Sequence, residues 1–251
     1  MLYGSREIMD VVLKDVKTKE PKVYLESLTT SALEFAGATV YARGGKGHPK
    51  RIGWDSEKDI TMNMEDSLIS KESLEVLTGS KFVTGSKIVH KKEVITVELD
   101  SADLSITLSR IPIITAATPA FFYKTNDGTS MNQKLVSSNT GTDVVLTGDS
   151  LVAGDKVIAD YYYEAPLTTK SLTVTSDIFP GTYMLEGTTV WRNEDGYDVE
   201  ALYTIPKLKI LPNFSIGMAS SGDPQPFTFN AEVLKDSNST AMVIIDLLEE
   251  E

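Results

Sequence analysis

The sequence predicts a mainly β fold, and three observations support this prediction. Apolar and polar residues alternate with a period of two through most of the 251 residues, as they do in strands that have one face on a core. β-Branched and aromatic residues dominate these runs, and such side chains fit a pleated surface. Turn-forming Gly, Asn and Asp residues separate the runs. We therefore expect a β-sandwich or partial barrel with one flanking α-helix.

The individual strands follow from the same alternation. Ile60, Met62 and Met64 occupy alternate positions, so a strand places their side chains on one face. The alternation between residues 94 and 109 predicts two consecutive strands joined by a turn at residues 100–103. Further runs of this kind lie at residues 172–175, 189–192 and 227–233.

The predicted helix begins after Ser70 and ends before Gly79. Ser70 is a suitable N-cap, because its hydroxyl can accept a hydrogen bond from an amide of the first turn. Leu74 and Leu77 share one face, and Gly79 stands where a left-handed residue commonly ends a helix. Residues 30–35 are a second candidate, for which a short helix and a strand with a bulge are both compatible with the sequence.

The composition changes between Ile111 and Pro166, where Ser, Thr, Asn and Gly are frequent. About four short strands at close spacing are predicted here, which is typical of a small Ig-like β-sandwich module. We therefore expect an inserted module at residues 111–166. The flanking residues, 1–110 and 167–251, would then form one discontinuous domain, since the ends of an inserted module commonly lie close together.

The charge and cysteine content exclude several classes of function. The formal net charge of -12 argues against binding nucleic acid through a basic surface, because such binding needs Lys and Arg to replace counterions. A channel lined with carboxylates would instead repel phosphate and let DNA slide, although solubility alone also explains an acidic surface. The absence of Cys excludes disulfides, zinc–thiolate sites and thiol nucleophiles. We expect no signal peptide and no membrane anchor, and hence assembly in the cytoplasm.

No pattern of catalytic or metal-binding residues stands out. His48 and His90 have no partner His at metal-ligand spacing. The glycine-containing stretches at residues 44–47 and 79–87 lack the spacing of a phosphate-binding loop. Residues 193–198 hold several oxygen ligands but lack the spacing of a calcium loop, so a hairpin turn is predicted there. We therefore expect no catalytic residue, no metal site and no cofactor, and a protein that is not an enzyme.

A long, glycine-rich basic loop in an acidic chain is the main candidate site. Opposite charges favour contacts between copies of one protein, although an ordinary solvated loop would have the same composition. The candidate residues for assembly are Arg43, Gly44, Gly45, Lys46, Gly47, His48, Lys50 and Arg51.

Three stretches of the sequence are similar to bacteriophage tail tube, or major tail, proteins. The first runs from the strand that contains Ile60 through the predicted helix to Gly79. The second combines residues 179–187 with residues 205–208, and the third is the closing stretch at residues 222–234. All three lie in the N-terminal and C-terminal thirds, outside the predicted insert.

This resemblance implies a structural virion protein with a tail-tube-type β-sandwich or partial barrel. Subunits of this kind form rings, typically hexameric, that stack into a channel for DNA passage. The resemblance also implies that the loop at residues 43–51 joins stacked rings and that the inserted module projects outward. The implied partners are further copies of the chain, the tail sheath, tape-measure, baseplate or tail-terminator proteins, and DNA as a transient, non-specific cargo.

Two other functions are compatible with the sequence alone. A capsid decoration or baseplate protein would explain the insert, because small β-sandwich modules often decorate particle exteriors. A carbohydrate-binding β-sandwich would explain Trp54, Trp191 and the run at residues 161–163, whose rings can stack on sugars. In a strand, however, the middle ring of that run faces opposite to its two neighbours.

Overall fold

The computed structural model describes residues 2–100, 103–124, 133–147, 151–218, 220–221 and 226–248. The chain divides into two compact units, each of which is described by itself. Unit 1 comprises Met1–Phe82 and Leu172–Glu251, and unit 2 comprises Val83–Ser171. Strands dominate both units, so the predicted mainly β class is confirmed.

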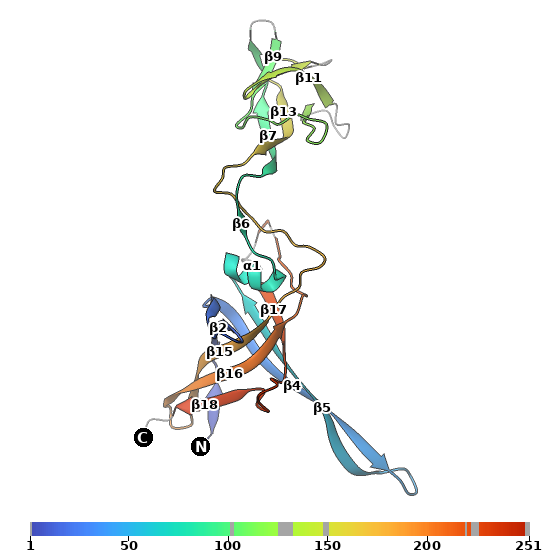
Figure 1. The fold of residues 1–251 in the computed structure, drawn as a ribbon, viewed down its shortest axis with the longest axis vertical. Helices are drawn as coiled ribbons and strands as arrows, with labels where there is room; N and C mark the ends of the chain where they lie inside the picture. Colours follow the sequence, from blue (N-terminus) through green and yellow to red (C-terminus); the bar gives the residue numbers. More distant parts are fainter. Residues whose placement is uncertain are drawn as a thin grey trace. The chain divides into compact units, whose positions relative to one another are not determined.

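In its described residues, unit 1 forms a nine-stranded antiparallel sheet with one helix (Figure 1). The strand order is β3-β2-β15-β16-β17-β5-β4, with β1 paired to β15 and β18 paired to β16. The elements are β1 (Tyr3–Ser5), β2 (Asp10–Asp15), β3 (Pro21–Leu25), β4 (Leu28–Arg43), β5 (Lys50–Asp66), α1 (Lys71–Thr78), β15 (Thr182–Asn193), β16 (Asp198–Ile210), β17 (Phe227–Val233) and β18 (Ile244–Leu248).

The core of unit 1 follows the predicted alternation, although the run at residues 172–175 forms no strand. Ile60, Met62 and Met64 are all buried on one face of β5. On the neighbouring strand β17, Phe227 and Phe229 are buried and their rings lie 5.0 Å apart between centroids. Burial of these side chains removes apolar surface from water, which is the main favourable contribution to folding.

The helix α1 forms as its end signals predict. The Ser70 hydroxyl accepts a hydrogen bond from the Ser73 amide at 2.9 Å, and the Ser73 hydroxyl accepts one from the Ser70 amide at 3.0 Å. Gly79 has a φ of +74°, and its amide donates to the Glu75 carbonyl at 2.9 Å. The other helix candidate, residues 30–35, lies within β4, just after a register shift; the alternative of a strand with a bulge is therefore confirmed.

Unit 2 contains a seven-stranded antiparallel sheet in the order β7-β13-β10-β11-β12-β9-β8, and β6 and β14 pair separately. Its buried cluster combines aromatic and aliphatic side chains of inner strands of this order, including Phe122 of β10, Tyr161 of β13 and Leu146 of β12. The strands are β6 (Val83–Thr84), β7 (Ile88–Thr96), β8 (Glu98–Asp100), β9 (Asp103–Thr107), β10 (Phe121–Lys124), β11 (Gln133–Thr140), β12 (Asp143–Thr147), β13 (Lys156–Glu164) and β14 (Lys170–Ser171).

Unit 2 is larger than the insert predicted at residues 111–166. β7 pairs with β13 along its whole length of nine residues, and β9 pairs with β12. These pairings join residues 88–107 to strands of the predicted insert, which explains why the two units divide at Val83 and Ser171 instead. The strands predicted between residues 94 and 109 also differ in detail, because the hairpin partner of β9 is the short strand β8, while β7 ends at Thr96.

Candidate assembly surface

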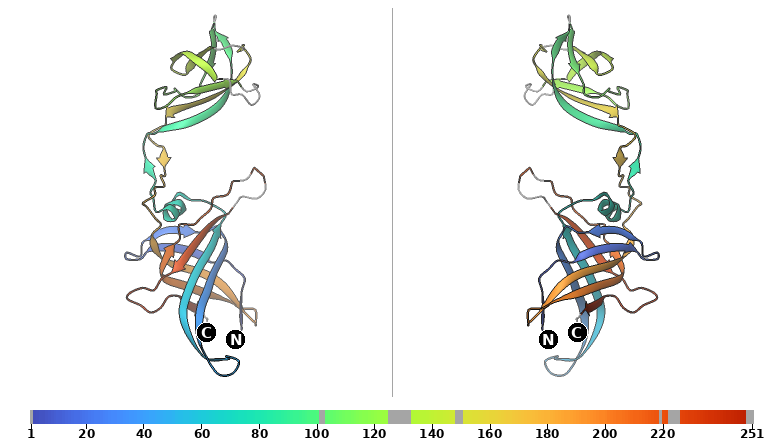
Figure 2. Two further views of the ribbon diagram at one scale, coloured as in Figure 1. Left: turned by 90° about the vertical axis from the view of Figure 1, so that its right-hand side faces the viewer. Right: turned by 90° about the vertical axis from the view of Figure 1, so that its left-hand side faces the viewer.

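The basic loop of the sequence is the tip of a long hairpin. Strands β4 and β5 have 16 and 17 residues and pair from Leu28 opposite Asp66 to Arg43 opposite Lys50. In the half of the hairpin near α1, residues 60–66 of β5 are buried or half-buried. In the other half, every residue of β5 from Lys50 to Asp59 is exposed. Figures 1 and 2 show the hairpin projecting from the rest of unit 1, with its tip at the end opposite α1.

The tip is a compact turn stabilised by its own backbone. Gly45, Gly47 and His48 have φ values of +89°, +86° and +48°, in the left-handed region that glycine adopts at little cost. The His48 amide donates to the Gly45 carbonyl at 3.1 Å, and the Gly44 amide donates to the Pro49 carbonyl at 3.4 Å. The glycines of the predicted loop therefore serve to close the hairpin.

The cations of the tip divide into two groups. The Arg51 Nε donates to the Gly44 carbonyl at 3.0 Å, and the Lys50 ammonium lies 3.8 Å from the centroid of the Tyr41 ring. These two side chains are thus held against the hairpin, where the ring face attracts a cation. Arg43 and Lys46 are exposed, so they present positive charge to an incoming surface.

One face of the exposed half of the hairpin is apolar. Val40 lies opposite Trp54, and Ala42 lies opposite Ile52; because directly paired residues project to the same side, these side chains form one patch. The side chains of Val40, Ile52 and Trp54 are 60%, 55% and 54% exposed. Trp54, a candidate for stacking on sugars in the sequence, thus lies in an apolar patch with Val40 and Ile52.

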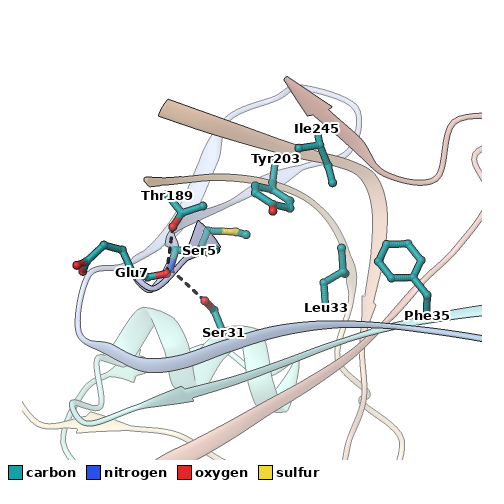
Figure 3. Close-up of a pocket in the computed structure, with 9 residues that line it drawn as sticks. Ser5, Glu7, Ser31, Leu33, Phe35, Thr189, Tyr203 and Ile245 are labelled. Carbon is teal, nitrogen blue, oxygen red and sulfur yellow. Dashed lines mark hydrogen bonds between the residues drawn. The ribbon is translucent and has the colours of Figure 1, made fainter. Parts of the chain in front are cut away.

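A cavity of about 200 Å³ lies at the base of the hairpin. Its walls come from five strands and from the segment before β2, and Figure 3 shows the Glu7 carboxylate pointing away from the other lining side chains. The Met9 amide donates to the Ser31 hydroxyl at 3.0 Å, and the Thr189 hydroxyl donates to the Glu7 carbonyl at 3.1 Å. The cavity is lined by Ser5, Glu7, Met9, Ser31, Leu33, Phe35, Thr189, Tyr203 and Ile245.

Unit 2 contains an ionisable pair, Glu93 and Tyr161, whose pKa values are both strongly shifted. The Glu93 carboxylate accepts hydrogen bonds from the Ser109 amide at 3.0 Å, the Ser109 hydroxyl at 2.7 Å and the Tyr161 hydroxyl at 2.7 Å. Burial pushes the pKa of Glu93 upward, but Ser109, Tyr161 and Lys91 outweigh it and hold this pKa at about 2. Burial and the bond to Glu93 raise the pKa of Tyr161 to about 12. A carboxyl group with a pKa of about 2 and a phenol with a pKa of about 12 are poor general acids and bases near pH 7.

The remaining sequence candidates lie apart from one another. His48 is at the hairpin tip of unit 1, whereas His90 is on β7 of unit 2, 2.6 Å from the Asp160 carboxylate. Residues 193–198 form the predicted turn between β15 and β16, with Gly196 at a φ of +88°. Within the described ranges, no group of three or more His, Asp or Glu side chains could hold a metal ion. Among the same residues, no helix is long and apolar enough to cross a membrane.

The chain matches one family of known proteins and no curated protein. The model of the YomU/Tube protein family matches residues 5–245, which include both units almost completely. This match confirms the resemblance to phage tail tube proteins that the sequence indicates. The chain therefore belongs to the YomU/Tube protein family, and it is a structural protein of the phage tail tube type.

Proposed function

We propose that this chain is the ring-forming subunit of a tail tube and that the β4–β5 hairpin joins one ring to the next. The observation that supports this proposal is the combination of an apolar face and a basic tip on a hairpin that extends beyond its own sheet. An isolated two-stranded ribbon is marginally stable in water. Large side chains such as Trp54 are therefore better explained by a partner that covers them.

A second copy of the chain is the partner that charge favours. The whole chain has a net charge of -12, whereas the tip presents Arg43 and Lys46 to solvent. A basic tip on an acidic copy brings opposite charges together and disfavours contact between two tips. At about 3.3 Å per residue, the exposed part of β5 reaches roughly 30 Å, which is enough to contact a copy in a neighbouring ring.

The edges of the unit 1 sheet suggest how copies could close into a ring. β3 and β4 stand at the two ends of the strand order, so each has an edge available for pairing. Pairing such edges between copies removes exposed backbone groups and closes a barrel around a channel. Tail tube rings typically contain six copies of their subunit, and we propose the same number here.

The proposed role is structural and requires no catalysis. An acidic channel wall would let DNA pass without tight binding, since carboxylates repel phosphate. In this proposal unit 2 projects from the outside of the tube, where a sheath could contact it, and tape-measure, baseplate or tail-terminator proteins meet the inside and the ends. Assembly would take place in the cytoplasm of the bacterial host before the tube becomes part of the virion.

Substitution of the apolar patch tests the proposal. The double variant Ile52→Ser and Trp54→Ser should remain a folded subunit, because both side chains are more than half exposed. We expect electron microscopy to show rings or tubes for the unmodified protein and at most isolated rings for the variant. The control is Tyr197→Ser, which removes a 72% exposed ring from the turn between β15 and β16. Tubes of normal length from the double variant, or a protein that stays monomeric at high concentration, would overturn the proposal.

A further inference from the structure

The outer face of unit 2 carries aromatic rings where polar side chains are expected. In an antiparallel sheet packed on one side, the opposite face is normally polar. Phe122 and Tyr161 point into the core and are fully buried. Because side chains alternate along a strand, Phe121, Tyr123 and Tyr162 point to the other face. All three are partly exposed.

These rings lie on two adjacent strands in a defined register. On β10 and β13, Phe121 is opposite Asp160 and Tyr123 is opposite Ile158. The Phe121 and Tyr123 rings are nearly parallel, with an interplanar angle of 15° and centroids 6.3 Å apart. The two rings therefore form one aromatic unit on this face. We refer to Phe121, Tyr123, Tyr162, His90 and Asp160 as the aromatic platform.

Fixed polar groups lie among the rings. The His90 Nε2 is 2.6 Å from the Asp160 carboxylate, and its ring meets the edge of Tyr162 at 5.5 Å between centroids. The side chains of His90 and Asp160 remain 48% and 32% exposed. Lys92 pairs with Asp160 across the strands and is also exposed. The platform therefore offers hydrogen-bonding groups in fixed positions beside flat rings.

The mixture of aromatic and charged side chains on this face favours a sugar over a protein as the ligand. The centre of a protein–protein interface is depleted of charged residues, whereas Asp160 and Lys92 lie directly beside Phe121 and Tyr162 here. A pyranose ring has the opposite requirement, because its C–H groups pack on an aromatic face while its hydroxyls bond to carboxylate, imidazole or ammonium groups. On the same face, Tyr123, Ile158 and Val94 form an apolar row across three strands. The charged pair of Asp160 and Lys92 separates this row from Tyr162, so the apolar area is interrupted.

We propose that the aromatic platform binds an oligosaccharide whose pyranose units expose a face of axial hydrogens, such as β-linked glucose, galactose or their N-acetylamino derivatives. Asp160 and Lys92 carry opposite charges side by side, so this part of the face has no excess positive charge to attract polysaccharides with carboxylates or phosphates. The site is independent of the proposed ring assembly, since every residue of the platform belongs to unit 2. A failure to bind sugar would thus leave the tube proposal unaffected, and a failure to form tubes would leave the sugar-binding proposal unaffected.

The test measures binding of the full chain to cellohexaose and chitohexaose by titration calorimetry, with oligogalacturonate as the acidic comparator. We expect at least one neutral probe to bind and the acidic probe not to bind. Tyr123→Ala and Asp160→Asn should each weaken binding by about tenfold, since a stacked ring or a charged hydrogen bond contributes on the order of one tenfold step. The matched control is Tyr197→Ala, an exposed tyrosine of unit 1 that should bind as the unmodified protein does.

Hydroxyl-radical footprinting of the unmodified protein keeps the test independent of variant folding. The bound probe should protect Tyr123 and Tyr162 from oxidation and leave Tyr197 reactive. The proposal is overturned if neither neutral probe binds, or if a bound probe protects neither ring. Protection of the platform in assembled tubes without any sugar would also overturn it, because the face would then be a contact between copies.

Discussion

Glu93→Gln should destabilise unit 2 at neutral pH, and the size of the effect follows from the hydrogen bonds of this carboxylate. The pKa of Glu93 falls from 4.5 to about 2, and at about 1.4 kcal/mol per pKa unit this difference corresponds to about 3 kcal/mol. The side chain is 19% exposed, so solvent screening reduces the expected loss to about 2 kcal/mol. The neutral amide of Gln cannot accept all the bonds that Ser109 and Tyr161 donate.

The pH dependence of this loss has a definite sign. A carboxyl group whose pKa is lower in the folded state stabilises the fold fully above its unfolded pKa. That stabilisation disappears as the pH falls from about 4.5 to about 2. The difference in unfolding free energy between the unmodified protein and Glu93→Gln should therefore be constant from pH 6 to 8 and shrink toward zero near pH 2.

Hydrogen exchange can assign the effect to unit 2. Both tryptophans, Trp54 and Trp191, belong to unit 1, so tryptophan fluorescence reports the unfolding of unit 1 and should not change. Amide protection of β7 and β13 should fall in Glu93→Gln and not in the control Glu98→Gln, which alters an exposed carboxylate of β8. Equal protection of β7 in the variant and the unmodified protein at pH 7 would refute this account of the network.

Three further substitutions test the fold of unit 1 by thermal unfolding. Gly79→Ala forces a side chain into a left-handed backbone and against the Phe179 carbonyl, so a loss above about 2 kcal/mol is expected; an unchanged Tm would contradict the packing of this turn. Ser70→Ala removes the N-cap of α1 and should cost about 1 kcal/mol. Phe229→Ala leaves a cavity under β17 and should lower the unfolding free energy by about 3–5 kcal/mol. A nearly unchanged Tm would mean that the Phe229 ring is not buried as it is in this structure.

The elements that sequence alone predicts are those whose signals are local. The helix α1 is specified within ten positions, by a cap at Ser70, an apolar face that includes Leu77 and a left-handed residue at Gly79. The buried face of β5 is equally local, because Ile60, Met62 and Met64 need only a period of two. Neither prediction depends on which strand lies beside the segment.

The extent of unit 2 depends on pairings between distant segments, which no local pattern reveals. The composition changes near Ile111, but β7 ends well before that point and pairs with β13 about 60 residues later. The residues of β7 alternate as those of unit 1 strands do. The same limit applies to the aromatic platform, since only the register brings Phe121 beside Asp160 and Tyr162 beside His90.

The hairpin shows how a sequence pattern can report an assembled state. Ile52 and Trp54 occupy alternate positions as Met62 and Met64 do, so the pattern alone predicts burial for both pairs. In the single chain only the second pair is buried. β17 pairs with residues 61–66 of β5, whereas β4 is the only described strand beside residues 50–59. A period-two apolar face without a covering layer is costly to expose to water. The mismatch between pattern and burial therefore marks the hairpin as the surface that a further copy should cover.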